Sequence, residues 1–393
     1  MTGIAEAPGD AAFRTEIRDW LETQLSGDFA GLRGSGGPGR EHEQLAERAA
    51  WERRLGEAGW IGIGWPDARY GRALSLAQQV IFHEEYARAA APGRLGHIGE
   101  QLLAPTLLAH GSEEQKQRFL PGVGSGEVFW CQGYSEPDAG SDLANVGTRA
   151  VLDGDRWVVT GQKIWTSLAH VSDWCFVIAR TELGSKRHAG LSFLLLPMDQ
   201  PGITVRPIVQ LTGTSEFNEV FFDGAVAAAG DVVGEAGNGW RVAMSLLGFE
   251  RGVSTLGQQI GFARELETIT ERARVNGAAD DPVLADRIVS AWVDLQVMRH
   301  TALRTLGADA ARDAPWAANV SKLLWANWHR RLGELAMAVE GPAAAVTSGL
   351  PYELTDEQRL FLFSRADTIY GGSNEVQRNV LAERHLGLPR DRA

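Results

Sequence analysis

The sequence has little cysteine, no long apolar run and no surplus of positive charge. Only Cys131 and Cys175 are cysteines, so a disulfide framework is excluded, a reducing compartment is favoured, and both thiols are expected to be buried and inert. The longest apolar stretch, LSFLLLP, is far too short to cross a bilayer. The N-terminus lacks a basic start followed by an apolar run, so no secretory signal is expected. These absences predict a cytoplasmic protein without membrane contact.

The charge balance is acidic, with 50 Asp and Glu residues against 38 Lys and Arg residues and a formal net charge of −12. Such a chain offers no basic stripe for a phosphate backbone, so nucleic acid is not an expected partner. No metal site is expected either. What the chain does contain is 44% hydrophobic residues over 393 positions, enough for a large core and for more than one domain.

The character of the chain changes twice. Apolar residues recur at helical spacing from Ala11 to about Leu120, where Ser112 and Gln115 have the spacing of a capping box. Short β-rich runs such as WCFVIART and LSFLLLPM follow, and helical spacing returns after GEAGNGW and holds as far as DEQRLFLFSRADTIYG. We expect a multi-domain α+β protein with an N-terminal helical domain (1–128), a central β barrel or sandwich (129–233) and a C-terminal four-helix bundle (234–393).

Two segments combine hydroxyls, glycine and an aromatic ring. In CQGYSEPDAGSDLA, residues 131–144, glycine and hydroxyl groups could bind a pyrophosphate or a flavin, although a simple domain-junction turn would use the same residues and is favoured by composition alone. In GQKIWTSLAH, Trp165 precedes Thr166 and Ser167. An indole can stack on an isoalloxazine while a hydroxyl binds its polar edge, but a single tryptophan is more often part of a core.

Glu250 interrupts an apolar stripe on the helix expected to begin near Asn238. Burial raises the pKa of a carboxyl toward the range of a useful general base, whereas a core glutamate paired with Arg251 or another helix is the simpler alternative. Ser254, Gly257 and Gly261 follow on the same side, where either a groove or close helix packing would explain the missing bulk. The stripe consists of Val242, Leu246, Val253, Gly257 and Ile260.

Three segments in this order, YSEPDAGSDLA, GQKIWTSLAHVSDW and IYGGSNEVQRNVLAERHLGLP, resemble the acyl-CoA dehydrogenase family. The similarity covers nearly the whole chain. It implies a helical domain, a β domain and a four-helix bundle, with FAD between the β domain and the bundle. It also implies that a carboxylate removes the α proton of an acyl-CoA thioester while hydride leaves the β carbon for flavin N5. The product is then a trans-2-enoyl-CoA, and electrons pass to an electron-transfer flavoprotein.

The resemblance also implies roles for individual residues. Ser135 matches a hydroxyl position that binds the flavin, and Ser141 matches a position near the pyrophosphate and CoA. Trp165 and Ser167 match the pair that flanks the isoalloxazine. The expected flavin contacts are Gln132, Tyr134, Ser135, Ser141, Trp165 and Ser167. The expected substrate contacts are Ser141, Arg251, Tyr370, Gly371 and, in a basic loop that an exposed hairpin would explain equally well, Lys186 and Arg187.

The base departs from the commonest family pattern. Many members have Tyr-Glu-Gly in the C-terminal motif and use that glutamate, but this chain has Tyr370, Gly371 and Gly372 there. Glu375 stands at a position that the family often fills with an amide. A minority of members place the base on the first bundle helix, in a Glu-Arg pair, and the segment GFERG supplies Glu250 at that position. The stripe and the resemblance together predict that Glu250 is the base.

Assembly is a second departure. Typical homotetramers have an Arg-x-x-Phe-Gly segment that reaches the FAD of a neighbouring subunit, but here that region is ERARVNGAADDP, and a later glycine-rich motif is reduced to AVEGPAAAV. This resembles one subunit of actinobacterial heterotetrameric dehydrogenases that act on steroid side-chain CoA esters. We expect a homo- or hetero-oligomer and a bulky or branched acyl group. Two alternatives stay open: a flavin monooxygenase or nitrogen-oxidising enzyme on the same fold, and a partner subunit inactive alone.

Overall fold

The computed structural model describes residues 9–249, 254–305, 316–347 and 353–390. Its contacts divide the chain into two compact units. The bundle unit consists of Met1–Thr23, Leu76–Ala90 and Val253–Ala393, and the sheet unit consists of Gln24–Ser75 and Ala91–Gly252. The order of helices, then strands, then helices confirms the fold class expected from the sequence. The three domain boundaries stay a prediction.

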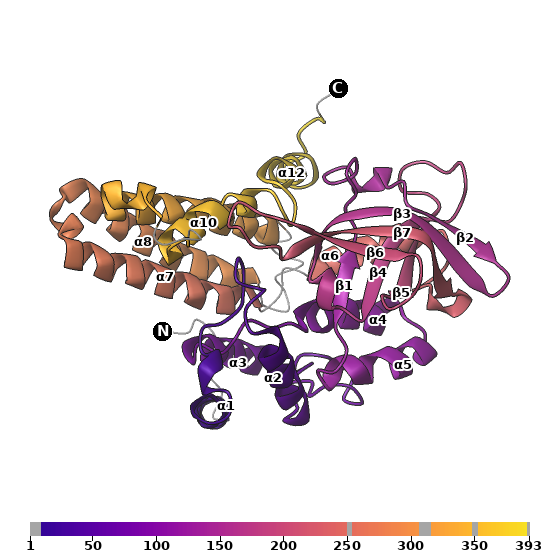
Figure 1. Ribbon diagram of the computed structural model, residues 1–393, viewed down its shortest axis with the longest axis horizontal. Helices are drawn as coiled ribbons and strands as arrows, with labels where there is room; N and C mark the ends of the chain where they lie inside the picture. The colour runs from indigo at the N-terminus through magenta and orange to yellow at the C-terminus, as the bar shows by residue number, and fades with distance from the viewer. Residues whose placement is uncertain (1–8, 250–253, 306–315, 348–352, 391–393) are drawn as a thin grey trace. The chain divides into compact units, whose positions relative to one another are not determined.

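The described part of the sheet unit contains a seven-stranded sheet (Figure 1). Its strands are β1 (Trp130–Gly133), β2 (Arg149–Asp153), β3 (Arg156–Ser167), β4 (Trp174–Arg180), β5 (Leu191–Pro197), β6 (Ile203–Ile208) and β7 (Phe217–Ala228). Across the sheet their order is β1, β4, β2, β3, β7, β6, and β5 pairs with β4. Strands β1 and β2 run parallel to β4, and the other pairs are antiparallel.

Strands β4 and β5 are buried on both faces, which explains why their sequences are continuous apolar runs instead of alternating ones. One face carries Phe176 and Phe193, whose rings stack with centroids 5.4 Å apart, and the other carries Cys175. The predicted burial of both cysteines is confirmed, since Cys131 and Cys175 are free thiols in the sheet interior.

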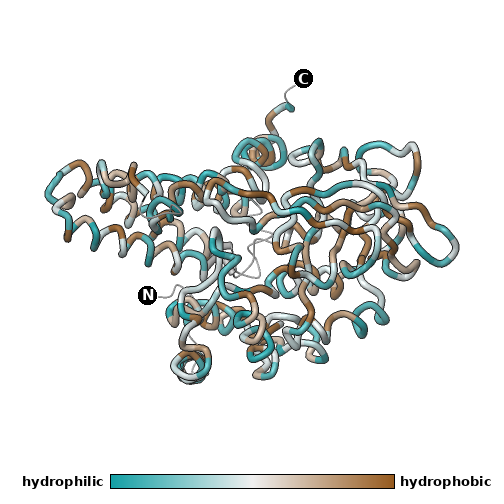
Figure 2. The backbone as a smooth tube through the Cα atoms, in the orientation of Figure 1, coloured by the Kyte–Doolittle hydropathy of each residue, from teal (hydrophilic) through white to brown (hydrophobic). Residues whose placement is uncertain are grey.

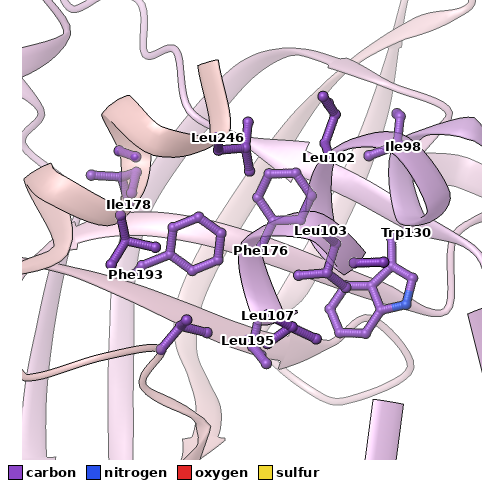
Figure 3. Close-up of a cluster of buried hydrophobic side chains, with 14 of the residues drawn as sticks. Ile98, Leu102, Leu103, Leu107, Trp130, Phe176, Ile178, Phe193, Leu195 and Leu246 are labelled. Carbon is purple, nitrogen blue, oxygen red and sulfur yellow. The ribbon is translucent and has the colours of Figure 1, made fainter. Parts of the chain in front are cut away.

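Helices cover the phenylalanine face of the sheet. The helices of this unit are α2 (Leu45–Glu57), the π-helical turn Gly99–Leu103, α4 (Ala104–His110), α5 (Glu113–Gly124) and α6 (Gly239–Phe249). Figure 3 shows Leu246 of α6 together with Leu103 and Leu107 around the ring of Phe176. The capping box predicted at Ser112 and Gln115 is present at the start of α5.

The named secondary-structure elements among the described residues of the bundle unit are all helices. The unit contains α1 (Asp10–Ser26) as far as Thr23, α3 (Leu76–Arg88), α7 (Ser254–Asn276), α8 (Pro282–Thr305), α10 (Ala317–Glu340), α11 (Asp356–Phe363) and α12 (Asn374–Val380). The long helices α7, α8 and α10 pack against one another, α11 and α12 pack on α10, and α3 packs on α7. Figure 2 shows hydrophobic and hydrophilic segments alternating along the three long helices, as expected where a helix buries one face.

One helix ends earlier than the sequence predicts. Helical spacing was expected to hold through DEQRLFLFSRADTIYG, but α11 ends at Phe363 and a 3-10 turn covers Ala366–Thr368. The carbonyl of Phe361 accepts hydrogen bonds from the side chains of Ser364 and Arg365, so it is taken by side chains at the point where a further helical N–H would use it. The C-terminal motif therefore begins in a turn.

The described residues of the expected stripe belong to two units, since Val242 and Leu246 lie on α6 in the sheet unit and Gly257 and Ile260 lie on α7 in the bundle unit. Val242 and Leu246 are buried in the sheet unit, as predicted. Among the described helices, none combines the length and the low polarity that a membrane crossing requires.

Candidate functional site

The two segments that combine hydroxyls with an aromatic ring lie side by side in the sheet unit. The first follows β1 and the second forms the end of β3. The N–H of Ile164 donates to the carbonyl oxygen of Ser135 at 2.9 Å. The ammonium group of Lys163 donates to the carbonyl oxygen of Tyr134 at 3.0 Å. Hydrogen bonds to the main-chain carbonyls of Tyr134 and Ser135 thus join residues about 30 positions apart in the sequence.

A buried ion pair fixes this junction. Lys163 is fully buried and donates to a Glu136 carboxylate oxygen at 2.8 Å. The same carboxylate accepts the N–H groups of Gly147 at 2.6 Å and Thr148 at 2.9 Å, so it closes the loop between β1 and β2. Burial lowers the pKa of Lys163. Burial would raise the pKa of Glu136, but the charge of Lys163 outweighs it and lowers that pKa, so the carboxylate is ionised at neutral pH.

Trp165 is held in an unusual conformation. It has φ of 60°, in the left-handed region, and lies at a shift of register between β3 and β7. Its indole is 56% exposed and meets the ring of Phe217 edge-on at 6.3 Å. A bulky residue rarely adopts positive φ. A large exposed aromatic side chain on a strand presents a flat surface to a ligand.

Polar groups of the two segments are available for a ligand. Within the described residues, the hydroxyls of Ser135, Ser141 and Ser167 make no hydrogen bond. The buried hydroxyl of Thr166 also has no partner among them. An exposed indole beside unsatisfied hydroxyls matches what an isoalloxazine and its ribityl chain require, so the residues fit a flavin.

Two further predicted flavin contacts lie on or just after β1. Gln132 is half-buried in the strand. Tyr134 is buried, and its ring lies edge-on to Phe176 and Phe193. The tyrosine ring thus belongs to the sheet core, which leaves its main chain as the part that faces the motif.

The basic loop after β4 is joined to the first motif by a residue that the sequence analysis missed. Lys186 and Arg187 are exposed, and Arg187 has φ of 55°. The guanidinium of Arg180 donates to the carbonyl oxygens of Ala189 at 2.9 Å and Ala144 at 3.1 Å. It therefore ties the loop to the end of the 131–144 segment.

The C-terminal motif lies in the bundle unit. The side chain of Tyr370 donates to Asp367 at 2.6 Å, and the Gln377 amide donates to the carbonyl oxygens of Gly371 at 3.2 Å and Gly372 at 3.3 Å. Glu375 lies in the first turn of α12, where it is 74% exposed and meets Arg378 at 3.5 Å. An acidic residue there is favoured by the helix dipole.

Glu250 and Arg251 lie outside the described residues, so their assignment rests on the sequence. The structure does describe Gly257 and Gly261, for which the sequence left open a groove or close helix packing. A methyl group at Gly257 would meet His83 of α3 at 3.5 Å, whereas one at Gly261 would meet nothing within 4 Å. Gly257 therefore faces a packed helix.

Lys163 and Glu136 are the most important residues that the sequence analysis overlooked. A signal for Lys163 was present, because Trp157 and Val159 set the inward parity of β3 and Lys163 occupies the same parity. Nothing local marked Glu136 as its partner.

Comparisons with known proteins agree on one family. Models of the acyl-CoA dehydrogenase N-terminal, middle and C-terminal domains match residues 8–127, 131–225 and 237–386. A protein named acyl-CoA dehydrogenase IpdE1, from Mycobacterium tuberculosis, is 60% identical over 380 residues, which cover 96% of this chain and 98% of that protein. Its namesake from Mycolicibacterium smegmatis is 59% identical over 389 residues with the same coverage.

Solved structures give the same result. A structure described as the Tcur3481-Tcur3483 steroid ACAD matches with a TM-score of 0.85 at 29% identity, over 99% of this chain and 100% of that one. The ChsE4-ChsE5 complex from Mycobacterium tuberculosis matches with a TM-score of 0.83 at 29% identity, over 100% of both chains.

Proposed function

The chain belongs to the acyl-CoA dehydrogenase family and is an FAD-dependent dehydrogenase, and from this premise we propose that it oxidises a bulky or branched acyl-CoA thioester to the trans-2-enoyl-CoA. The observation that best supports flavin chemistry is the junction at Trp165, where an exposed indole and free hydroxyls are fixed by a buried ion pair. Ser135, Ser141, Trp165 and Ser167 would hold the cofactor, with Gln132 and the main chain of Tyr134. When bound, FAD supplies a hydride acceptor for the β carbon of the acyl group.

Glu250 is the proposed base. It takes the proton from the α carbon, and the electrons of that C–H bond form the new double bond while the β C–H bond is lost as hydride. A proton next to a thioester is weakly acidic, so a desolvated carboxylate with a raised pKa is suited to remove it. Glu375 is exposed and paired with Arg378, which counts against it as the base. Arg251, Tyr370 and Gly371 are proposed to border the substrate, with Ser141, Lys186 and Arg187 near CoA.

The size of the acyl group is inferred from relatives. The Tcur3481-Tcur3483 structure is described as a steroid ACAD, and it aligns with this chain over nearly its whole length. Carried over to this chain, the similarity supports a bulky or polycyclic substrate. Electrons are proposed to pass to an electron-transfer flavoprotein, and the two buried free thiols support a reducing, cytoplasmic location.

A related chain is the proposed partner. The structural neighbours are described as the Tcur3481-Tcur3483 steroid ACAD and the ChsE4-ChsE5 complex. The face of α8 opposite its packed side carries exposed apolar residues at helical spacing, although Leu295 and Met298 already fill the packed side. We call this exposed set the outer face of α8, and it is suited to bury against a second dehydrogenase chain. It consists of Val289, Trp292, Val293 and Val297.

The base is tested by anaerobic flavin bleaching. Holoenzyme is mixed with a saturated steroid side-chain CoA thioester, or with octanoyl-CoA as a small probe, and the loss of flavin absorbance is followed. Glu250→Gln is expected to slow bleaching by about a thousandfold, the usual range for loss of a positioned base. Glu375→Gln is the matched control and should bleach like the wild type. The opposite order would show that Glu250 is not the base.

A further inference from the structure

One face of α10 is polar although it is buried. Asn319, Lys322 and His329 are each at most 7% exposed and lie at helical spacing on the side that meets the C-terminal motif. Burying amides and charges is costly unless each finds a partner. We call these residues the polar face of α10, and their partners show what they do.

Asn319 acts through Gln377 on the turn formed by Gly371 and Gly372. Its amide donates to the Gln377 side-chain oxygen at 2.7 Å, and both residues are buried. The Gln377 nitrogen in turn donates to the carbonyl oxygens of Gly371 and Gly372. With its oxygen held by Asn319, the Gln377 amide has only one orientation in which its nitrogen reaches both carbonyls.

The turn itself requires glycine. Gly371 and Gly372 have φ of 61° and 84°, and a methyl group on Gly372 would come within 2.5 Å of the Gln377 nitrogen. The Gly371 C=O and the Gly372 N–H belong to one trans peptide and point in opposite directions. Because the Gln377 side chain donates a hydrogen bond to the Gly371 oxygen, the Gly372 N–H points away from Gln377. Neither glycine N–H donates to a described residue. The turn therefore presents unused donors in a fixed direction.

His329 and Lys322 hold the residues just before the turn. His329 meets the Asp367 carboxylate at 2.5 Å and Glu265 of α7 at 2.9 Å. The other Asp367 oxygen accepts the Tyr370 hydroxyl, and Lys322 donates to the Asp367 carbonyl at 2.8 Å. The Lys322 ammonium also lies 4.6 Å from the centre of the Tyr370 ring. Asp367 is thus held by its side chain and main chain together.

We propose that the polar face of α10 sets the conformation of the segment 370–372 and that Asn319 and Asp367 are positioning residues for the acyl-CoA thioester. The inference rests on the proposed function, in which this segment borders the substrate. An enolate oxygen that develops during α-proton removal is stabilised by N–H donors only when they are already aimed at it. The clamps from Asn319 and Asp367 keep those donors in place.

The test uses holoenzyme, produced with its partner chain, and two measurements. Steady-state oxidation of the acyl-CoA substrate gives kcat and KM. Titration with acetoacetyl-CoA reports how well the site stabilises an enolate. The enolate of this compound gives a long-wavelength absorbance band when it lies beside an oxidised flavin. Asn319→Ala and Gln377→Ala should each lower kcat about tenfold to a hundredfold, with KM changed less than about threefold, and weaken the enolate band. The double variant should have about the same kcat and enolate band as either single variant, because both substitutions break the same hydrogen-bond chain from Asn319 through Gln377 to the turn.

Controls separate this effect from general damage. Arg331 lies on the same helix, and Arg331→Ala removes its exposed pair with Asp294 of α8, so both measurements should stay unchanged. Asp367→Asn keeps the shape of the side chain and should lower kcat and weaken the enolate band. If Asp367→Asn does not fold, Tyr370→Phe removes only the hydroxyl that donates to Asp367 and should have the same two effects. Wild-type kcat and band in Asn319→Ala and Gln377→Ala would overturn the inference. No band and no oxidation in the wild type would overturn the proposed function and, with it, the inference.

Discussion

At the scale of single residues, the charge of His329 is decided by its neighbours. Burial would lower its pKa, but the carboxylates of Glu265 and Asp367 outweigh burial and raise the pKa from 6.5 to about 10. The imidazolium is therefore charged at neutral pH, and both ring nitrogens donate to the carboxylates. A buried cation between two anions is neutralised only while all three keep their charges.

This raised pKa predicts a loss of stability in alkali. Because the folded pKa of His329 lies above its unfolded value, its contribution is fully present below pH 6.5 and is lost as the pH rises toward about 10. The midpoint of thermal unfolding of His329→Gln should fall below that of the wild type at pH 6.5, and the gap should narrow toward pH 10. A gap that stays constant over this range would contradict the assignment of charge.

At the scale of elements, α7 contains two glycines in its interior. Glycine costs a helix about 1 kcal/mol relative to alanine. Gly257 has room for a methyl group in ordinary contact with His83, and Gly261 has open space. Close packing against α3 explains Gly257 without a groove.

Both alanine variants are therefore expected to stabilise α7. Gly257→Ala and Gly261→Ala should each raise the stability of the bundle unit by about 0.5–1 kcal/mol and leave kcat/KM unchanged. Chemical unfolding and steady-state kinetics check this. A fall in kcat/KM for Gly257→Ala alone, with Gly261→Ala unaffected, would instead favour a substrate groove at Gly257.

At the scale of the whole molecule, the outer face of α8 bears on assembly. An exposed tryptophan surrounded by valines is costly in water, and its burial contributes about 1.5–3 kcal/mol per large side chain. This is the surface that we propose meets the partner chain.

Trp292→Ser with Val293→Ser should weaken that association. A loss of about 3 kcal/mol corresponds to about a hundredfold weaker binding, so the mass measured by light scattering at micromolar concentration should shift from the assembly toward separate chains. Val275→Ser is the matched control, since Val275 is 71% exposed but lies on α7. An unchanged mass in the double variant would exclude this face from the interface.

The sequence by itself determined the fold class, strands β3 to β7 and the motifs that identify the family. Runs such as LSFLLLP and the capping box at Ser112 are local signals, and local signals are readable because hydrophobic period and cap chemistry act within a few residues. The sequence also showed that the C-terminal motif has glycines where many relatives have a base. The role of Glu250 stays a prediction from that pattern.

Only the tertiary structure decided which polar residues act together. Lys163 finds Glu136, Arg180 joins two loops, and Asn319 reaches Gly371 through Gln377, each across tens of residues. No local rule predicts such pairs, because a buried polar group is satisfied by whatever partner the folded chain brings within about 3 Å. The end of α11 at Phe363 has a local cause instead, since the side chains of Ser364 and Arg365 donate to the carbonyl oxygen of Phe361 three and four residues earlier.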